Sequence, residues 1–302
     1  MKSLVSILVP IYGVEKYIER CARSLFEQTY SNIEYVFVND CTKDKSIELL
    51  MNVLNEYPHR KGQVKLIHHE RNRGLAAARN TAVYNMTGEY VWHVDSDDYI
   101  ETQAVELLVN EIQKTNAEVI IFGYNTVISY QITPFSVYKT EKHTYIKQLL
   151  LNAIPASMWN KFYSASFYRK IDVLSIEGIN QGEDYAVIPR ILYKTTKIGW
   201  LDKPLYFYDM TNLGSYSNNI SLSSIKSLKK ADDVLYDFFK EVDEYKDVID
   251  NCTLGPIQIL KEDRTTTKTS DSESIYITSN YYVENKIQES KVDVKKLEKE
   301  EK

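Results

Sequence analysis

The sequence has few of the residues that mark several protein classes. Ten glycines and seven prolines among 302 residues exclude a collagen-like or low-complexity chain. The three cysteines, Cys21, Cys41 and Cys252, lie far apart and form no CxxC pair, so neither a zinc knuckle nor a disulfide framework is predicted. Because there are only five histidines and no HExxH motif, we expect any metal site to be built from oxygen ligands.

The chain also lacks an excess of positive charge and any long apolar run. It carries 37 Lys and Arg residues against 42 Asp and Glu residues, so nucleic acid is not an expected partner. The apolar run at the N-terminus is too short for a signal-peptide core or a membrane span, and no apolar segment reaches 18 residues. We therefore expect a soluble, cytoplasmic protein.

The first 125 residues alternate β-branched runs with helical patterns. The runs predict strands at 5–9, 33–38, 64–67, 90–94 and 119–122, with Pro10 ending the first. Between them, apolar residues recur every three or four positions, as on one face of a helix. Strands separated by helices predict an α/β fold with a mostly parallel sheet and helices on both faces. Further along, residues 223–240 predict a helix, and the polar residues 261–274 predict a loop or disorder.

The strongest chemical signal is the run Asp95-Ser96-Asp97-Asp98 after the fourth predicted strand. Ligands of open α/β sheets bind beyond the carboxyl ends of the strands. Three carboxylates in four residues repel one another unless a cation neutralises them. Asp95 and Asp97 are two residues apart, so both can point to one side and share a metal ion. The alternative is a surface turn that caps the next helix.

Two further polar groups belong to the same edge of the predicted sheet. Asp40 follows the second strand and can accept a hydrogen bond from a nucleobase ring N–H; the alternative is an Asx turn or a helix N-cap. Residues 72–74 and Arg79 offer backbone and cationic contacts near a helix start. The alternative there is a turn, an Ala-rich helix and one solvated arginine.

The second half of the chain contains two weaker signals. Glu183 and Asp184 precede an apolar stretch, so they can be a general base and its neighbour, or simply acids at a helix start. Trp159-Asn160-Lys161, taken alone, indicates one core residue with polar neighbours.

Together these motifs resemble family 2 glycosyltransferases, in order and spacing over about residues 3–217. The matching segments are 5–12, 15–18, 24–30, 39–44, 72–80, 88–91, 95–98, 159–161 and 183–184. The resemblance implies a GT-A fold with a Rossmann-like mixed sheet, a nucleotide-sugar donor, Mn²⁺ or Mg²⁺, and inversion at the anomeric carbon. It implies a glycosyltransferase domain at 1–217, with a nucleotide-sugar half at about 1–98 and an acceptor half at 99–217. A helical and partly disordered extension would occupy 218–302.

The resemblance also implies residue roles. Asp95 and Asp97 match the DxD pair that holds ribose, diphosphate and metal, and Asp98 is a third candidate ligand. Asp184 matches the usual base, with Glu183 beside it. The other implied contacts are Pro10, Tyr12, Asp40, Arg79 and Ser96 on the nucleotide sugar, with Asp40 reading the base, and Trp159 and Lys161 on the acceptor side.

Some positions depart from the family pattern. Asn39 and Cys41 replace the usual Asp and Gly on either side of Asp40. Met210 and Asn212 stand where many relatives carry arginines, which puts phosphate contacts from that loop in question. Pro189 falls within the helix expected after Asp184, so we expect that helix to be kinked or to start late.

The expected function is transfer of a sugar, most readily from a UDP-sugar, to a hydroxyl of a saccharide or glycolipid in surface polysaccharide synthesis. A lipid-linked acceptor would place the enzyme peripherally at the inner face of the membrane. The alternatives are a nucleotidyltransferase or phosphohydrolase, and a non-catalytic nucleotide-sugar-binding protein. The first strand is not followed by a Gly-rich phosphate loop, and Tyr99 stands where an aspartyl-phosphatase motif has Thr or Val.

Overall fold

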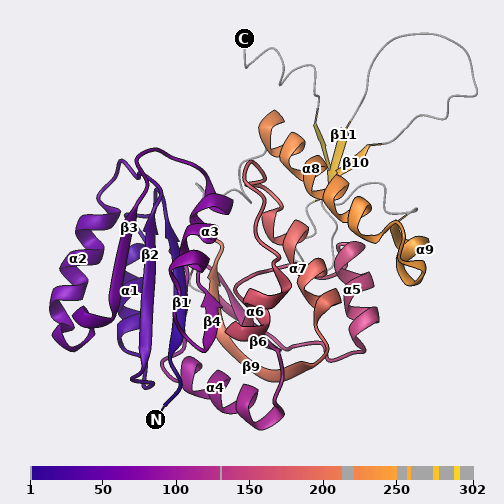
Figure 1. Cartoon of the computed structure of the whole chain (residues 1–302). Helices are drawn as coiled ribbons and strands as arrows, with labels where there is room; N and C mark the ends of the chain where they lie inside the picture. The colour runs from indigo at the N-terminus through magenta and orange to yellow at the C-terminus, as the bar shows by residue number, and fades with distance from the viewer. Residues whose placement is uncertain are drawn as a thin grey trace, which may run out of the picture.

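The computed structural model describes residues 2–129, 131–212 and 221–249, and the backbone of three short strands beyond them. Within this part, one nine-stranded sheet has the order β3-β2-β1-β4-β8-β6-β9-β5, with β7 paired to β6. Helices cover both faces of the sheet (Figure 1). The mixed α/β architecture expected from the sequence is confirmed.

The N-terminal half supplies four parallel strands: β1 (Val5–Ile11), β2 (Ile33–Asn39), β3 (Val64–His68) and β4 (Tyr90–His93). The intervening helices are α1 (Ile18–Phe26), α2 (Ser46–Glu56), the 3-10 helix η1 (Pro58–Gln63) and α3 (Leu75–Asn85). Strand β1 lies between β2 and β4, so the chain winds outward from it in both directions. Such a switch point opens a crevice at the carboxyl ends of the strands.

Strand β1 does not end at Pro10, which corrects the prediction. It pairs with β2 as far as Ile11. Leu8 accepts the amide of Val94 on the β4 side. The backbone of Pro10, two residues further on, faces the β4 side as well. Strand β4 pairs with β1 only as far as Leu8, so no strand in the described part of the chain lies opposite Pro10 on that side. The missing N–H of proline therefore interrupts no sheet hydrogen bond.

The second half turns the sheet from parallel to mixed. Its strands are β5 (Tyr99–Ile100), β6 (Val119–Ile128), β7 (Gln131–Phe135), β8 (Lys161–Ser164) and β9 (Ile198–Asp209). Among these five strands, β6 and β9 are the one parallel pair. Strand β8 runs antiparallel to both β4 and β6. The sequence predicts the end of this strand at Phe122, but β6 continues beyond it. An irregularity at Gly123 shifts the register between β6 and β9, and the two strands then pair again.

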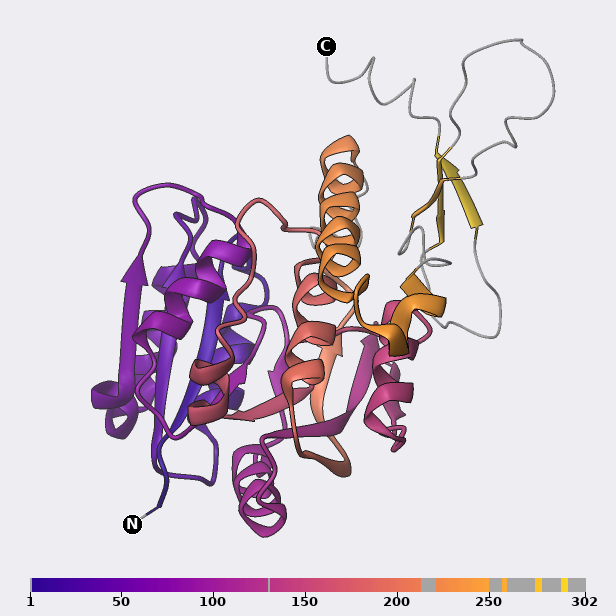
Figure 2. The same ribbon diagram turned by 45° about the vertical axis from the view of Figure 1, so that its right-hand side comes forward.

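Two hydrophobic cores flank the sheet. Alternate residues of β1 point to opposite sides, with Ile7 and Val9 in one core and Leu8 in the other. Helices α1, α2 and α4 (Ala104–Thr115) pack on the first side. The second side holds α3, α5 (Lys142–Leu150), α6 (Ala165–Ile171), α7 (Glu183–Lys194) and α8 (Leu222–Phe239). Figures 1 and 2 both show α8 beside α7.

After α8 come η3 (Asp243–Tyr245) and α9 (Lys246–Ile249). Strands β10 (Ile257–Ile259), β11 (Ile275–Thr278) and β12 (Glu289–Val292) form a separate antiparallel sheet. The sequence predicts α8 but none of these three strands. The predicted loop at 261–274 lies outside the described residues.

Helix α7 begins at Glu183, directly after Gly182 with φ +80°. Pro189 lies inside it, and the helix continues to Lys194. The expectation of a late start is therefore wrong. None of the helices in the described residues is both long and apolar enough to cross a membrane.

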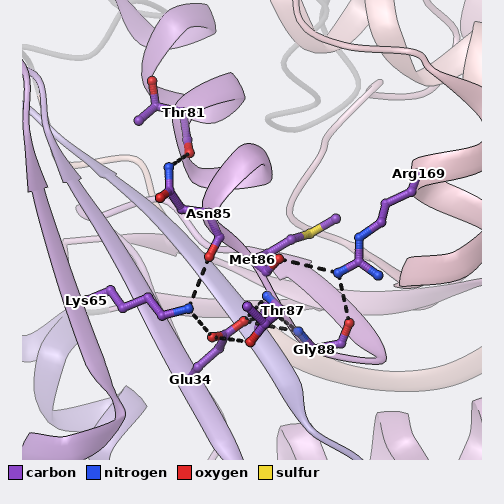
Figure 3. Close-up of polar contacts among 9 residues, drawn as sticks. Glu34, Lys65, Thr81, Asn85, Met86, Thr87, Gly88 and Arg169 are labelled. Carbon is purple, nitrogen blue, oxygen red and sulfur yellow. Dashed lines mark hydrogen bonds and ion pairs between the residues drawn. The ribbon is translucent and has the colours of Figure 1, made fainter.

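A buried carboxylate fixes the turn that starts β4 (Figure 3). Glu34 of β2 accepts hydrogen bonds from Ser6 Oγ, Lys65 Nζ, the amide and hydroxyl of Thr87, and the amide of Gly88. A Cβ on Gly88 would lie 2.6 Å from Ser6 Oγ, so only glycine fits this turn. The turn sets the start of β4, and β4 delivers Asp95 at its other end.

Candidate active site

A cleft of about 520 Å³ opens at the switch point between β1 and β4. Residues that the sequence places at the ends of β1, β2 and β4 meet there with residues from α3 and α7 and the segment before β8. The predicted site residues that line it are Pro10, Tyr12, Asp40, Arg79, Asp95, Ser96, Asp97, Trp159, Glu183 and Asp184. Asp98 and Lys161 do not line it.

Asp40 lies at the N-terminus of α3. One carboxylate oxygen accepts the backbone N–H of Arg73 at 2.8 Å and pairs with His69 Nδ1 at 2.7 Å, and the other accepts the N–H of Gly74 at 2.7 Å. The carboxylate therefore holds the backbone of the two residues that lead into α3. A carboxylate has about four acceptor positions, so Asp40 retains capacity for a ligand N–H in the cleft.

Arg79 of α3 lies beneath the acids rather than at the surface of the cleft, with its side chain 1% exposed. Its Nη2 atom lies 3.0 Å from Asp95 Oδ1, 3.3 Å from Glu183 Oε1 and 3.6 Å from Asp184 Oδ1. Burial opposes the charge, but the three carboxylates hold the pKa of Arg79 above its ordinary value. One guanidinium thus joins the carboxylate of the DxD segment to both acids of α7.

The two acids of α7 differ in their surroundings. The Glu183 side chain is 8% exposed and that of Asp184 20%. Burial, followed by the nearby charge of Asp184, raises the pKa of Glu183 well above its usual range. Asp184 Oδ2 accepts the backbone N–H of Met158 at 2.9 Å, which ties this acid to the segment that carries Trp159.

Asp95 and Asp97 both line the cleft. Burial raises the pKa of Asp95 to about 6; Arg79 lowers it and Asp184 raises it. Burial also raises the pKa of Asp97, while a hydrogen bond from Asn212 lowers it. Asn212 Nδ2 donates to Asp97 Oδ2 at 2.9 Å. Burial therefore disfavours the charged form of both carboxylates.

Asp98 points away from the cleft. Its oxygens accept the Tyr206 hydroxyl at 2.6 Å and the Asp209 amide at 2.7 Å, and its side chain is fully buried. These bonds tie β5 to β9, so we leave Asp98 out of the proposed metal ligands. Lys161 is also fully buried and donates to the Ser157 carbonyl and to Asn160 Oδ1. Burial lowers its pKa to about 7, an effect that Asp184 opposes.

Aromatic residues form the outer parts of the cleft. Tyr12 is 51% exposed at the rim. Trp159 is buried and stacks on Tyr206, with ring centroids 4.6 Å apart, and on Tyr208 at 5.5 Å. Its carbonyl accepts the indole N–H of Trp92 from β4.

Sequence reasoning missed several residues that line the cleft, and the polar ones among them include Asn180, Tyr208 and Asn212. Asn212 was noticed only as a departure from the family pattern. No short motif marks the other two, which reach the cleft from the loop before α7 and from β9. Gly74 has φ +90°, and a Cβ there would lie 2.3 Å from Asn180 Oδ1, so the close approach of Asn180 to α3 requires glycine.

The oxygen atoms of the cleft fit a hard divalent cation. In the described part of the chain, no group of three or more His, Cys, Asp or Glu side chains could hold a metal by itself. Asp95 Oδ1 and Asp184 Oδ1 are buried and, apart from their ion pairs with Arg79, have no hydrogen-bond partner within that part. Mg²⁺ commonly binds through one or two carboxylates, with substrate phosphates completing its coordination. Asp95 and Asp97 match that donor set.

Comparison with known proteins shows the family and the fold of the chain. Residues 6–172 match the family model described as Glycosyl transferase family 2. The chain is 33% identical over 217 residues to "Glycosyltransferase GlyA" of Streptococcus pneumoniae serotype 4. That alignment covers 68% of this chain but only 30% of GlyA, so the chain spans less than a third of that relative.

Solved structures share the fold. S. aureus TarS in complex with UDP-GlcNAc superposes with a TM-score of 0.61 at 22% identity, covering 83% of this chain and 79% of that chain. The mannosyltransferase PcManGT from Pyrobaculum calidifontis, in complex with GDP-Man and Mn²⁺, gives a TM-score of 0.59 at 14% identity. That match covers 83% of this chain and 69% of PcManGT.

Proposed function

The chain belongs to glycosyl transferase family 2, and we propose that it transfers a sugar from a nucleoside diphosphate sugar to an acceptor hydroxyl. The observation that carries the proposal is the arrangement around Arg79. This one buried guanidinium lies within 3.6 Å of an acid from the β4 end and two acids from α7, all lining one cleft at the switch point. Metal-binding and proton-accepting carboxylates are thereby held side by side.

We propose that the nucleotide lies across the ends of β1 and β2. Pro10 and Tyr12 would flank the base, and the remaining acceptor capacity of Asp40 would take its ring N–H. Uracil offers such an N–H, as do thymine and guanine, so UDP is the first candidate. The UDP-GlcNAc of the TarS complex supports that choice.

Asp95 and Asp97 would hold Mn²⁺ or Mg²⁺ together with the donor diphosphate, and Ser96 between them would contact the donor. The cation, when bound, neutralises the charge of the diphosphate leaving group. Mn²⁺ in the mannosyltransferase complex supports this assignment. Arg79 remains beneath the acids and positions them, so we now assign it a supporting role rather than a direct contact with the donor.

We propose Asp184 as the base. It is the more exposed acid of the pair, and the amide of Met158 holds it toward the segment that bears Trp159. Glu183 is the more buried acid of the pair, and we propose that it orients its neighbour. The acceptor oxygen, on losing its proton to Asp184, would attack the anomeric carbon opposite the diphosphate. A single displacement inverts the configuration and requires no covalent nucleophile.

The acceptor would be a hydroxyl of a saccharide or glycolipid in surface polysaccharide synthesis, with Trp159 on its side of the cleft. If that acceptor is lipid-linked, the enzyme would work at the inner face of the membrane. Lys161 would act indirectly, by holding residues 157–160 in place.

The proposal is tested by titrating UDP-GlcNAc, GDP-mannose and other nucleotide sugars into the protein by calorimetry, with and without Mn²⁺. We expect one donor to bind in a Mn²⁺-dependent manner, and Asp97→Asn to abolish that dependence. The matched control is Asp172→Asn, which changes an exposed acid outside the cleft lining. Binding that is unaffected by Asp97→Asn would refute the metal assignment, and no binding of any nucleotide sugar would refute the donor assignment.

A further inference from the structure

A second hollow, of about 390 Å³, adjoins the cleft and has no role in the mechanism above. Trp159 and Tyr208 line both cavities, so the two lie side by side. We call the second one the aromatic groove. Its size lies within the range of about 300–1,000 Å³ that is typical of small-ligand sites.

The floor of the aromatic groove is one face of the sheet. Side chains of a strand alternate between faces, and Phe122, Tyr124, Thr126 and Ile128 of β6 all line the groove. The same face extends onto both neighbouring strands, because Tyr124 pairs with Phe135 of β7 and Thr126 pairs with Tyr208 of β9. Residues 153–155 and α5 line the groove from the other side.

Aromatic rings dominate the lining. Tyr124 and Phe135 stack with ring centroids 5.1 Å apart and planes at 8°. Tyr124 also meets Trp159 edge to face at 4.8 Å. Polar groups are interspersed among the rings: the phenol hydroxyls, Thr126, Ser136 and Asn160. Among the residues that the structure describes, no charged side chain lines the groove.

We propose that the aromatic groove is a subsite for the sugar units of the acceptor that follow the unit being glycosylated. This inference rests on the proposed function. A pyranose ring presents a face of C–H groups and a rim of hydroxyls, which match aromatic faces bordered by hydroxyl and amide groups. Trp159 connects the two cavities, and its neighbour Met158 donates its N–H to Asp184. A saccharide with its reactive hydroxyl at Asp184 would therefore extend over Trp159 into the groove.

The lining favours a saccharide over a lipid chain. An acyl or isoprenoid chain would bury Thr126 and Ser136 without offering them a hydrogen-bond partner, and burying polar groups unpaired is unfavourable. Sugar hydroxyls can provide those partners. The absence of charged side chains likewise fits neutral sugar units.

The test measures saccharide binding in the absence of any donor. Glucose, galactose and N-acetylglucosamine oligosaccharides of one to four units are titrated by calorimetry, and their contacts are mapped by saturation-transfer NMR. We expect the affinity of at least one series to rise tenfold or more between one and three units. Tyr124→Ala should abolish this gain, and Tyr124→Phe should retain most of it because the ring remains. Ile132→Ala is the matched control, since Ile132 lies on the opposite face of β7 and is exposed.

Thermal denaturation and circular dichroism establish that each variant is folded, and Phe135→Ala replaces Tyr124→Ala if the latter is not. Affinity that does not increase with chain length in any series overturns the proposal. So does tighter binding of farnesyl phosphate than of every saccharide, lost in Tyr124→Ala, because the groove would then hold a lipid. If length-dependent saccharide binding persists while no nucleotide sugar binds, the proposed function fails and the subsite stands.

Discussion

Individual acids in this cleft have environments that separate their roles. Asp97 and Asp98 are adjacent in sequence, and both were candidate metal ligands. Successive residues point in different directions, so Asp97 faces the cleft while Asp98 is bound by Tyr206 and by the Asp209 amide. The sequence could identify the acidic run from its composition. It could not divide the run, because the groups that bind Asp98 come from β9, more than a hundred residues later.

We expect Asp184→Asn to retain donor binding and lose transfer. Asparagine keeps the shape and the hydrogen bond from Met158 but cannot accept a proton at neutral pH. A positioned base contributes roughly 10²–10⁴-fold, so kcat should fall at least a hundredfold. Glu183→Gln is the matched variant and should reduce kcat less. If Asp184→Asn turns over normally while Glu183→Gln is inactive, Glu183 is the base.

The raised pKa of Asp95 predicts a pH dependence of Mn²⁺-assisted donor binding. Below about pH 6 this carboxylate is protonated, and a protonated acid is a poor metal ligand. The affinity should be constant above about pH 7 and fall by roughly tenfold per pH unit below 6. A UDP-sugar is used for the calorimetry, because its diphosphate has no terminal phosphate group that titrates in this range. An affinity that stays constant between pH 7.5 and 5 would contradict the role of Asp95.

At the scale of elements, α3 holds β4 and α7 together through Arg79. Arg79→Met would leave three nearby carboxylates without their common partner. Removing one partner of a buried ion pair typically destabilises a protein by about 3–5 kcal/mol. We expect the free energy of unfolding, measured by chemical denaturation at pH 8, to fall by about this amount. The loss should shrink at pH 5, because the pKa of Asp95 is raised to about 6 and this carboxylate is then mostly protonated in the folded state. A loss of equal size at both pH values would show that packing rather than charge is responsible.

The turn between α3 and β4 depends on the negative charge of Glu34. Burial favours a higher pKa for Glu34, but hydrogen bonds from Lys65, Ser6 and Thr87 outweigh it and lower the pKa to about 2. The ionised form therefore stabilises the fold fully above pH 4.5, and this contribution is lost as the pH falls toward 2. Glu34→Gln should destabilise the protein by roughly 1.5–3 kcal/mol at pH 7 and by less at pH 3.

Urea denaturation at the two pH values measures this difference. Glu101→Gln, which alters an exposed acid, is the control and should have little effect at either pH. A destabilisation by Glu34→Gln that is the same at pH 7 and pH 3 would mean that the charge of Glu34 is not what fixes the turn.

The elements of the first half were predictable because each carries its own pattern. Predicted strands 33–38 and 64–67 begin with β2 and β3 and end within one residue of them. Strand β9 was not predicted, since its pairing with β6 crosses an irregularity and Pro204 lies within it. Cys41 has φ +58°, a conformation that glycine adopts easily, which gives a physical reason for the glycine that relatives have there.

For the whole molecule, the sequence predicted that the ends of β1, β2 and β4 meet, and they line one cleft. It did so because parallel strands place their carboxyl ends on one edge of the sheet. It could not predict the aromatic groove, because that surface forms only when β7, β6 and β9 pair in register. The order of these strands depends on contacts between distant segments rather than on any local pattern.

The central claim is that this cleft transfers a sugar with release of a nucleoside diphosphate. The most direct test is ³¹P NMR of the protein with Mn²⁺, each nucleotide sugar and the oligosaccharide panel, with Asp184→Asn as background. The account predicts a nucleoside diphosphate together with a glycoside of inverted anomeric configuration. Release of inorganic phosphate or pyrophosphate, or no product above the Asp184→Asn background with any donor, would contradict it.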